Sequence, residues 1–175
     1  MTSWTIREPE EADLPALREV GRRTFTDTFG PLYKPSDLQA FLDQVWGEEP
    51  VREEYRAGER TLRIAETPDG IAGFVKIGKP YMDLPEARPG RSAIELCQLY
   101  VDTPWQGTGL AQELMDWALA EARSRGHDDI YLSVYHDNLR AQRFYSKYGF
   151  VEVGRHIFMV GDQADDDRIW HLKLR

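Results

Sequence analysis

Residues 106–111 read Gln-Gly-Thr-Gly-Leu-Ala and follow the apolar segment 94–101, Ile-Glu-Leu-Cys-Gln-Leu-Tyr-Val. The spacing of Leu114, Trp117 and Ala118 then predicts a helix, so a strand leads through a short glycine-bearing loop into a helix. The first turn of a helix presents unpaired N–H groups and a partial positive charge, and glycine lets an anion approach them. The order of elements therefore indicates a phosphate-binding corner, the alternative being an ordinary surface loop.

Two familiar phosphate-binding motifs do not match this corner. The dinucleotide motif G-x-G-x-x-G requires a third glycine at position 112, where the chain has Gln112. The nucleotide P-loop requires Gly-Lys-Ser or Gly-Lys-Thr, and neither follows here. Gln106, Gly109 and Ala111 instead fit the pattern Q-x-x-G-x-A.

That pattern resembles the pyrophosphate-binding motif of the GNAT N-acetyltransferases, which accept Gln or Arg first and Gly or Ala last. Residues 138–150 strengthen the resemblance, because they read N-x-x-A-x-x-F-Y-x-K-x-G-F and follow a β-rich run at 129–135. The segments 24–30 and 158–162 are similar to those of PaiA-like polyamine N-acetyltransferases, so the resemblance covers nearly the whole chain.

The resemblance implies an α+β fold, the GNAT fold. Such a fold has a mixed, mostly antiparallel central sheet flanked by helices, with one parallel pair of strands that splay apart. Residues 94–101 and 130–135 would form that pair. The length and even composition of the chain suit a single domain over residues 1–175.

Apolar spacing and turn residues predict the other elements. They are a strand at Thr5–Arg7, a helix through Leu14–Phe25, a helix begun by a Ser36/Gln39 capping box, a short helix through Pro50–Tyr55, a hairpin of 61–65 with 71–77, a loop at 80–91, and strands 151–160 and 169–174. The polar residues from Gly161 to Asp167 are expected to form the turn between the last two strands.

Charge and cysteine content exclude several classes of protein. A net charge of −8 argues against nucleic acid as the main partner and is compatible with a cationic substrate. Cys97 is the single cysteine, and the four histidines lack metal-ligand spacing, so no disulfide and no metal is expected. Neither a secretory signal nor an apolar run long enough to span a membrane is evident, which predicts a cytoplasmic protein without a membrane partner. A homodimer is left open.

The resemblance also implies a co-substrate, acetyl-CoA, and the residues that bind it. The main chain of Leu99, Tyr100 and Val101 would contact the pantetheine arm, and the pyrophosphate would lie on Gln106, Gly107, Thr108, Gly109, Leu110 and Ala111. This loop contains no Lys or Arg, so backbone dipoles are expected to do most of the neutralising. Asn138 either caps its helix or binds the arm, and Arg140 and Arg143 either meet the phosphates or are solvated.

Acetyl transfer to an amine needs a proton acceptor, because an alkylammonium has a pKa of about 10, and it needs a donor for the departing thiolate. Tyr145 matches the family's sulfur-facing tyrosine in the resemblance and is the candidate donor; the alternatives are Tyr148 and a role of Tyr145 in an aromatic core stripe with Phe144. Glu95 is the candidate base, acting through an ordered water, and the alternative is a structural glutamate. Cys97 shares the strand parity of Glu95, but a lone cysteine on an apolar strand is usually just buried.

The expected substrate is a primary amine of a small molecule, with a polyamine such as spermidine or spermine favoured. A polyamine requires carboxylates and aromatic faces, which Asp27, Tyr33 and Trp46 could supply. The alternatives are acetylation of amino-acid, antibiotic or peptide amines, and an acyl-CoA-binding sensor or interaction module without turnover. Tyr145 and Glu95 favour an enzyme, because binding alone requires neither a proton donor nor a base.

Overall fold

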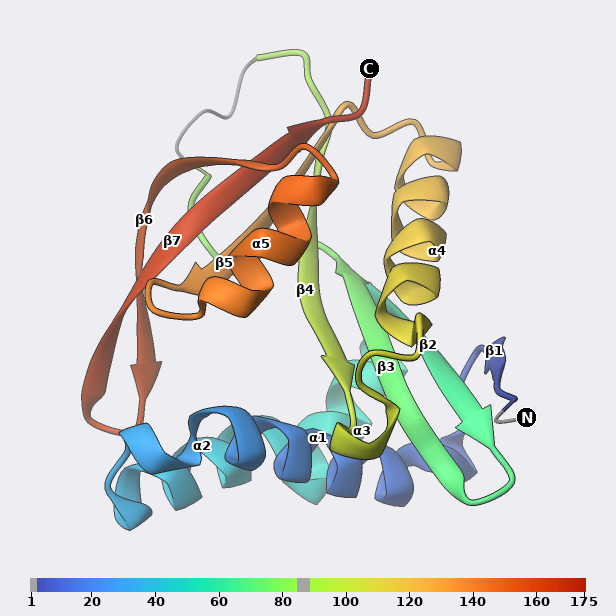
Figure 1. Ribbon diagram of the computed structural model, residues 1–175, viewed down its shortest axis with the longest axis vertical. Helices are drawn as coiled ribbons and strands as arrows, with labels where there is room; N and C mark the ends of the chain where they lie inside the picture. The colour runs from blue at the N-terminus through green and yellow to red at the C-terminus, as the bar shows by residue number, and fades with distance from the viewer. Residues whose placement is uncertain (1–2, 85–88) are drawn as a thin grey trace.

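A computed structural model describes residues 3–84 and 89–175, and its seven strands form one sheet of order β1-β2-β3-β4-β5-β7-β6. Neighbouring strands are antiparallel except for β4 and β5, which are parallel (Figure 1). The predicted mixed sheet with one parallel pair is therefore confirmed. The strands are β1 (Thr5–Arg7), β2 (Arg60–Thr67), β3 (Gly70–Gly78), β4 (Ala93–Val101), β5 (Asp129–Tyr135), β6 (Val151–Val160) and β7 (Gln163–Lys173).

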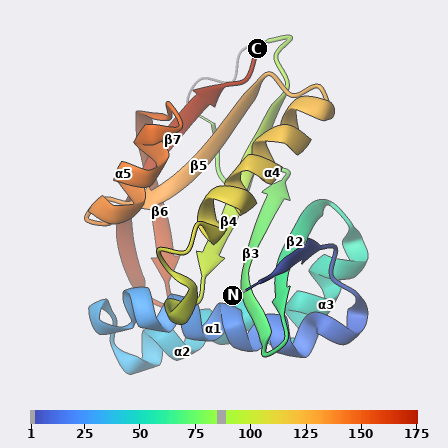
Figure 2. The same cartoon turned by 45° about the vertical axis from the view of Figure 1, so that its right-hand side comes forward.

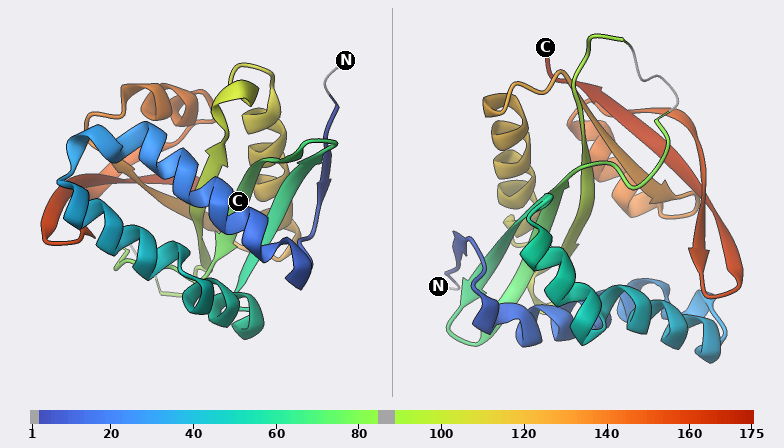
Figure 3. Two further views of the ribbon diagram at one scale, coloured as in Figure 1. Left: turned by 90° about the horizontal axis from the view of Figure 1, so that it is seen from below. Right: turned by 180° about the vertical axis from the view of Figure 1, so that it is seen from behind.

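Helices cover both faces of this sheet. They are α1 (Leu14–Phe29), α2 (Pro35–Trp46), α3 (Glu48–Ala57), α4 (Leu110–Ser124) and α5 (Leu139–Lys147). Helix α4 lies along β3 and β4 (Figure 2). In the view from below, α1 and α2 cross in front of the diverging ends of β4 and β5 and reach the tip of the β6–β7 hairpin (Figure 3, left).

The side chains of the sheet pack into two main cores, one on each face. Val75 belongs to the core under α4, whereas its neighbour Phe74 packs with α1 and α2, and both are fully buried. This division follows from the alternation of side chains along a strand.

The parallel pairing of β4 with β5 is short. It consists of Ala93 with Asp129, Ile94 with Ile130 and Glu95 with Tyr131. Beyond Glu95, β4 continues along β3, while β5 continues along β7 to the pair Tyr135–Asp167. The predicted splay is therefore present, and it opens from the level of Glu95 (Figure 1).

The structure corrects two local predictions. Helix α2 begins at Pro35 after Lys34 and has no side-chain cap, so the Ser36/Gln39 capping box is wrong. The turn between β6 and β7 ends at Asp162, because β7 already begins at Gln163.

Two further predictions concern the loop and the membrane. Of the predicted loop at 80–91, residues 85–88 lie outside the described residues. No helix in the described parts of the chain is both long enough and apolar enough to cross a bilayer.

Candidate active site

A cavity of about 640 Å³ lies where β4 and β5 diverge. Its walls combine segments that are distant in sequence: residues 95–101 of β4, the start of α4, helix α5, helices α1 and α2, and the β6–β7 hairpin. Gln106, Gly107, Gly109, Asn138 and Tyr145 all line it. The splay therefore brings both sequence motifs to one site.

The loop of residues 106–109 forms an open corner, called here the glycine corner, at the N-terminus of α4. Gly107 and Gly109 have left-handed φ angles of 77° and 96°, and a Cβ atom on either would meet no protein atom within 4 Å. Gly109 is the N-cap residue and supplies no side-chain cap to the helix. The start of α4 thus carries no side-chain cap and has open space beside Gly107 and Gly109, which is an arrangement suited to a phosphate.

A cation reaches this corner from α5. The Arg140 guanidinium donates a hydrogen bond to the Gln106 amide oxygen at 2.5 Å, and the Gln106 amide nitrogen donates to the Val101 carbonyl at 3.3 Å. Arg140, which was expected either to meet the phosphates or to be solvated, thus places a cation beside the corner. The spacing within the loop could not have shown this contact.

The other residues predicted to bind acetyl-CoA fall into two groups. Leu99, Tyr100, Val101 and Ala111 line the cavity, whereas Thr108 and Leu110 do not. The Leu110 side chain is fully buried in the core, so only its backbone is available at the corner. Asn138 lines the cavity and also caps α5, since its side chain accepts a hydrogen bond from the Ala141 N–H.

Tyr145 and Tyr148 point in different directions. Tyr145 lines the cavity, and its hydroxyl forms no hydrogen bond with the described residues. Burial raises the pKa of Tyr145 to about 12, so the phenol stays protonated and able to donate at neutral pH. The Tyr148 hydroxyl instead contacts α4, at 3.2 Å from a carboxylate oxygen of Asp116. Of the two tyrosines, Tyr145 has the better placement for a proton donor.

Glu95 lies at the level where the splay begins and lines the cavity. It is only 5% exposed, and its carboxylate accepts a hydrogen bond from the Tyr81 N–H. Burial raises the pKa of Glu95 to about 7, outweighing that hydrogen bond. A carboxyl group with this pKa can accept and release a proton near neutral pH.

Cys97 also lines the cavity, as expected for a residue two positions from Glu95 on the same face of the strand. It sits at an irregularity in the β3–β4 register, and its thiol contacts the Glu95 carbonyl at 3.6 Å. Burial raises the pKa of Cys97 to about 12, which disfavours the thiolate that a covalent mechanism would need.

The three residues predicted to bind substrate have different surroundings. Asp27 is exposed, accepts a hydrogen bond from the Thr103 hydroxyl at 3.3 Å, and does not line the cavity. Trp46 touches the cavity but is only 2% exposed, because it packs against Phe74 in the core. Tyr33 lines the cavity and donates a hydrogen bond to Asp165. Asp27 is therefore misplaced for a residue that binds substrate inside the cavity.

Sequence reasoning missed Asp165 and Asp167 by assigning them to a turn. Both lie in β7, line the cavity and are buried, at 5% and 7% exposed. Three consecutive aspartates show no polar–apolar alternation, so no local signal marked them as strand residues. In the structure Asp165, Asp167 and Ile169 are buried and Asp166 is exposed, because residues two apart share a strand face.

A family model described as the acetyltransferase (GNAT) family matches residues 22–150. The chain is 27% identical over 167 residues to an uncharacterised N-acetyltransferase of Lactobacillus delbrueckii subsp. lactis, covering 95% of each. It is 29% identical over 162 residues to one of Mycobacterium bovis, covering 93% of this chain and 98% of the relative.

Solved structures share the fold at lower identity. A PaiA N-acetyltransferase from Thermoplasma acidophilum in complex with coenzyme A has a TM-score of 0.74 at 19% identity, over 98% of this chain and 99% of that one. A spermidine N-acetyltransferase from Vibrio cholerae in complex with CoA and spermine has a TM-score of 0.68 at 21% identity, over 98% and 95% of the two chains.

The splayed sheet, the glycine corner and the cavity between them define an enzyme that transfers acyl groups from coenzyme A. More specifically, the chain belongs to the GNAT family and is an acetyl-CoA-dependent N-acetyltransferase.

The glycine corner leads to a prediction about cofactor affinity. Gly109→Leu should raise the dissociation constant of acetyl-CoA at least tenfold, or ~1.4 kcal/mol, because the new side chain enters the space left for the phosphate. Gly58→Leu is the matched control, since Gly58 is also left-handed and open but does not line the cavity. Both changes should lower the free energy of unfolding by about 1–2 kcal/mol. Equal calorimetric affinities for acetyl-CoA in the two folded variants would contradict the assignment of the corner.

Proposed function

We propose that this protein acetylates a primary amine of a small polycation, with a polyamine such as spermidine or spermine favoured. The observation that carries the proposal is that Glu95 and Tyr145 line the same cavity as the glycine corner. A proton acceptor and a proton donor are thereby available beside the place where the two substrates would meet.

Each of the two residues has a distinct role in the proposal. Glu95 accepts the proton that the ammonium group must lose before attack, directly or through a water. Tyr145 donates a hydrogen bond to the sulfur that departs. When bound, acetyl-CoA would supply the activated acetyl group; the glycine corner and Arg140 would hold its phosphates, and residues Leu99–Val101 would contact its arm.

Charge and aromatic content support a polycationic acceptor. Carboxylates from three strands or helices line the cavity: Glu54, Glu95, Asp165 and Asp167. Glu54 is already paired with the buried Lys76 at 2.9 Å, whereas Glu95, Asp165 and Asp167 form no ion pair with a described residue. Phe25, Phe29 and Phe158 add aromatic surface that a cation or its methylene spacers can contact. The spermidine N-acetyltransferase structure, which contains CoA and spermine, is consistent with a polycationic acceptor.

Salt dependence tests the charge of the acceptor. We expect spermidine to have a higher kcat/KM than neutral or anionic amines, and added salt to lower it, because screening shortens to about 8 Å at physiological ionic strength. Steady-state assays at two salt concentrations measure both effects. If an amino acid is the best acceptor and salt has no effect, the polyamine assignment is wrong.

Release of free thiol separates an enzyme from an acyl-CoA-binding module. The proposal expects thiol to accumulate from acetyl-CoA only when an amine is present. Tight binding of acetyl-CoA without thiol release, across polyamines, amino acids, aminoglycosides and peptides, would favour a sensor over the proposed enzyme.

A further inference from the structure

We infer that Asp167, supported by Asp165, anchors a second cationic group of the amine substrate, at the opposite wall of the cavity from Glu95. This inference rests on the proposed acetylation of a polycationic amine. It assigns the selection of that amine to the β6–β7 hairpin.

The two carboxylates are buried without a cationic partner. Both line the cavity, and the nearby basic side chains contact other groups: Arg168 pairs with Asp166 at 3.0 Å, and the His136 ring faces Asp137 at 3.3 Å. No ion pair joins Asp165 or Asp167 to a described Lys, Arg or His. Buried charges in proteins are normally paired, so the cavity lacks a cation that a substrate ammonium group can supply.

Neutral donors orient the carboxylates but leave one oxygen free. Tyr33 and Gln163 donate hydrogen bonds to the two oxygens of Asp165. Ser133 donates to Oδ2 of Asp167 at 2.8 Å, while Oδ1 of Asp167 has no partner among the described residues. Asp167 therefore presents an unpartnered oxygen, on a side chain more than nine-tenths buried, to the cavity that it lines.

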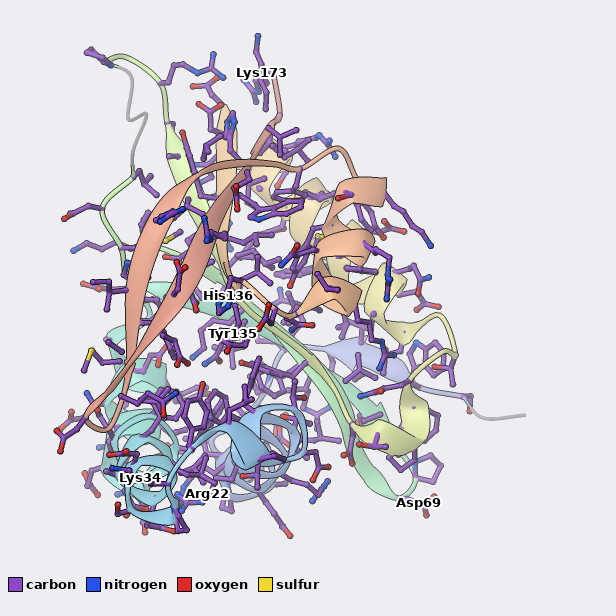
Figure 4. The ribbon with its side chains drawn as sticks, turned by 60° about the vertical axis from the view of Figure 1, so that its left-hand side comes forward. Arg22, Lys34, Asp69, Tyr135, His136 and Lys173 are labelled. Carbon is purple, nitrogen blue, oxygen red and sulfur yellow. The ribbon has the colours of Figure 1, made fainter. Side chains whose placement is uncertain are left out.

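Aromatic side chains line the same wall of the cavity. In the β6–β7 ladder His156 lies opposite Asp167 and Phe158 opposite Asp165, and both rings line the cavity. Figure 4 shows Tyr135 at the end of β5, between the hairpin and helices α1 and α2, where its ring meets Phe29 edge-on. Aromatic faces beside a carboxylate favour an ammonium group over a neutral group.

The register of the sheet sets the spacing between the two ends of the substrate. Glu95 pairs with Tyr131, and Asp167 pairs with Tyr135, so the two acidic positions are separated by four residues along β5. At about 3.3 Å per residue the separation along that strand is about 13 Å. A long polyamine can reach both positions more easily than a short diamine.

Amines of graded length and charge test the anchor. In the wild type, kcat/KM should rise from butylamine through 1,3-diaminopropane and putrescine to spermidine. Asp167→Asn should lower the value for spermidine about tenfold or more and leave butylamine nearly unchanged, since only a dication uses the charge. Asp167→Glu should retain the preference for spermidine because it retains the charge.

Asp166→Asn is the matched control. Asp166 is the neighbouring residue on β7, but it is exposed, pairs with Arg168 and does not line the cavity. This variant should keep the wild-type preference, and all of the folded variants should bind acetyl-CoA equally well. Equal losses for butylamine and spermidine in Asp167→Asn, or no loss for either, would overturn the anchor.

Calorimetric titration of spermidine into the protein saturated with coenzyme A keeps the test independent of turnover. The anchor predicts at least tenfold weaker binding by Asp167→Asn than by the wild type. Failure of the wild type to acetylate any amine would overturn the proposed function. Equal spermidine affinities in the two proteins would overturn the anchor alone.

Discussion

Replacing Glu95 with Gln is expected to lower kcat/KM for amine acetylation by about 10²-fold or more, the usual contribution of a positioned general base. Gln keeps the size of the side chain and can still accept the Tyr81 N–H bond, so the cavity should retain its shape. The affinity for acetyl-CoA should change little. Full activity in this variant would show that another group, or a chain of waters, removes the proton.

The pH profile provides a second test of Glu95. Because the pKa of Glu95 is about 7, the base form is lost as pH falls through 7, and kcat/KM should fall with it. Glu95→Asp should retain an acidic limb at a reduced rate, whereas Glu95→Gln should lose this limb. An unchanged profile in Glu95→Gln would assign the limb to a different group.

The stability of the fold should depend on pH in the opposite direction from kcat/KM. The pKa of Glu95 is raised from 4.5 to about 7 in the folded protein, so the stability gained from its protonation is complete below pH 4.5 and is lost as pH rises through 7. Glu95→Gln removes the buried charge and should melt at a higher temperature than the wild type above pH 7. A less active but more stable variant would separate a catalytic role from a structural one.

Tyr145→Phe is expected to reduce kcat by roughly 10²-fold with little change in the affinity for acetyl-CoA. The change removes one hydroxyl and keeps the ring, which packs edge-on against Phe144 and Phe150, so folding should be unaffected. Steady-state kinetics and calorimetry measure the two effects separately.

Tyr148→Phe is the control for this experiment. It removes a hydroxyl that contacts α4 and lies outside the cavity lining, so kcat should stay near the wild-type value. If Tyr148→Phe loses turnover while Tyr145→Phe does not, the proton donor has been assigned to the wrong residue.

The geometry of the corner proposed to bind the cofactor was largely predictable from sequence because its signals are local. A glycine that adopts a left-handed conformation, a helix start and an asparagine cap each depend on a few consecutive residues, as at Gly109 and Asn138. The parallel pair was predictable through family resemblance, and β4 and β5 have the expected geometry.

The cavity wall proposed to bind the amine was less predictable, because its contacts join residues that are far apart in the sequence. Tyr33, for example, meets Asp165 across 132 residues. Local rules assign a run of aspartates to a turn, yet tertiary packing extends β7 through Asp165 and Asp167. Asp27 lies on an exposed part of α1 outside the cavity lining, a position that became evident only with the helix packed on the sheet.

The β6–β7 hairpin is joined to α2 at its tip by the hydrogen bond from the Asp162 N–H to the Asp37 carboxylate, at 3.0 Å. The glycine corner, β4 and α5 are built from other parts of the chain. Under the proposed anchoring, mutational drift in the hairpin should exchange one amine for another while acetyl-CoA continues to bind. A directed-evolution library for new acceptors would be concentrated at positions 156, 158, 165 and 167, where a change alters the reach and charge of the wall without touching the donor site.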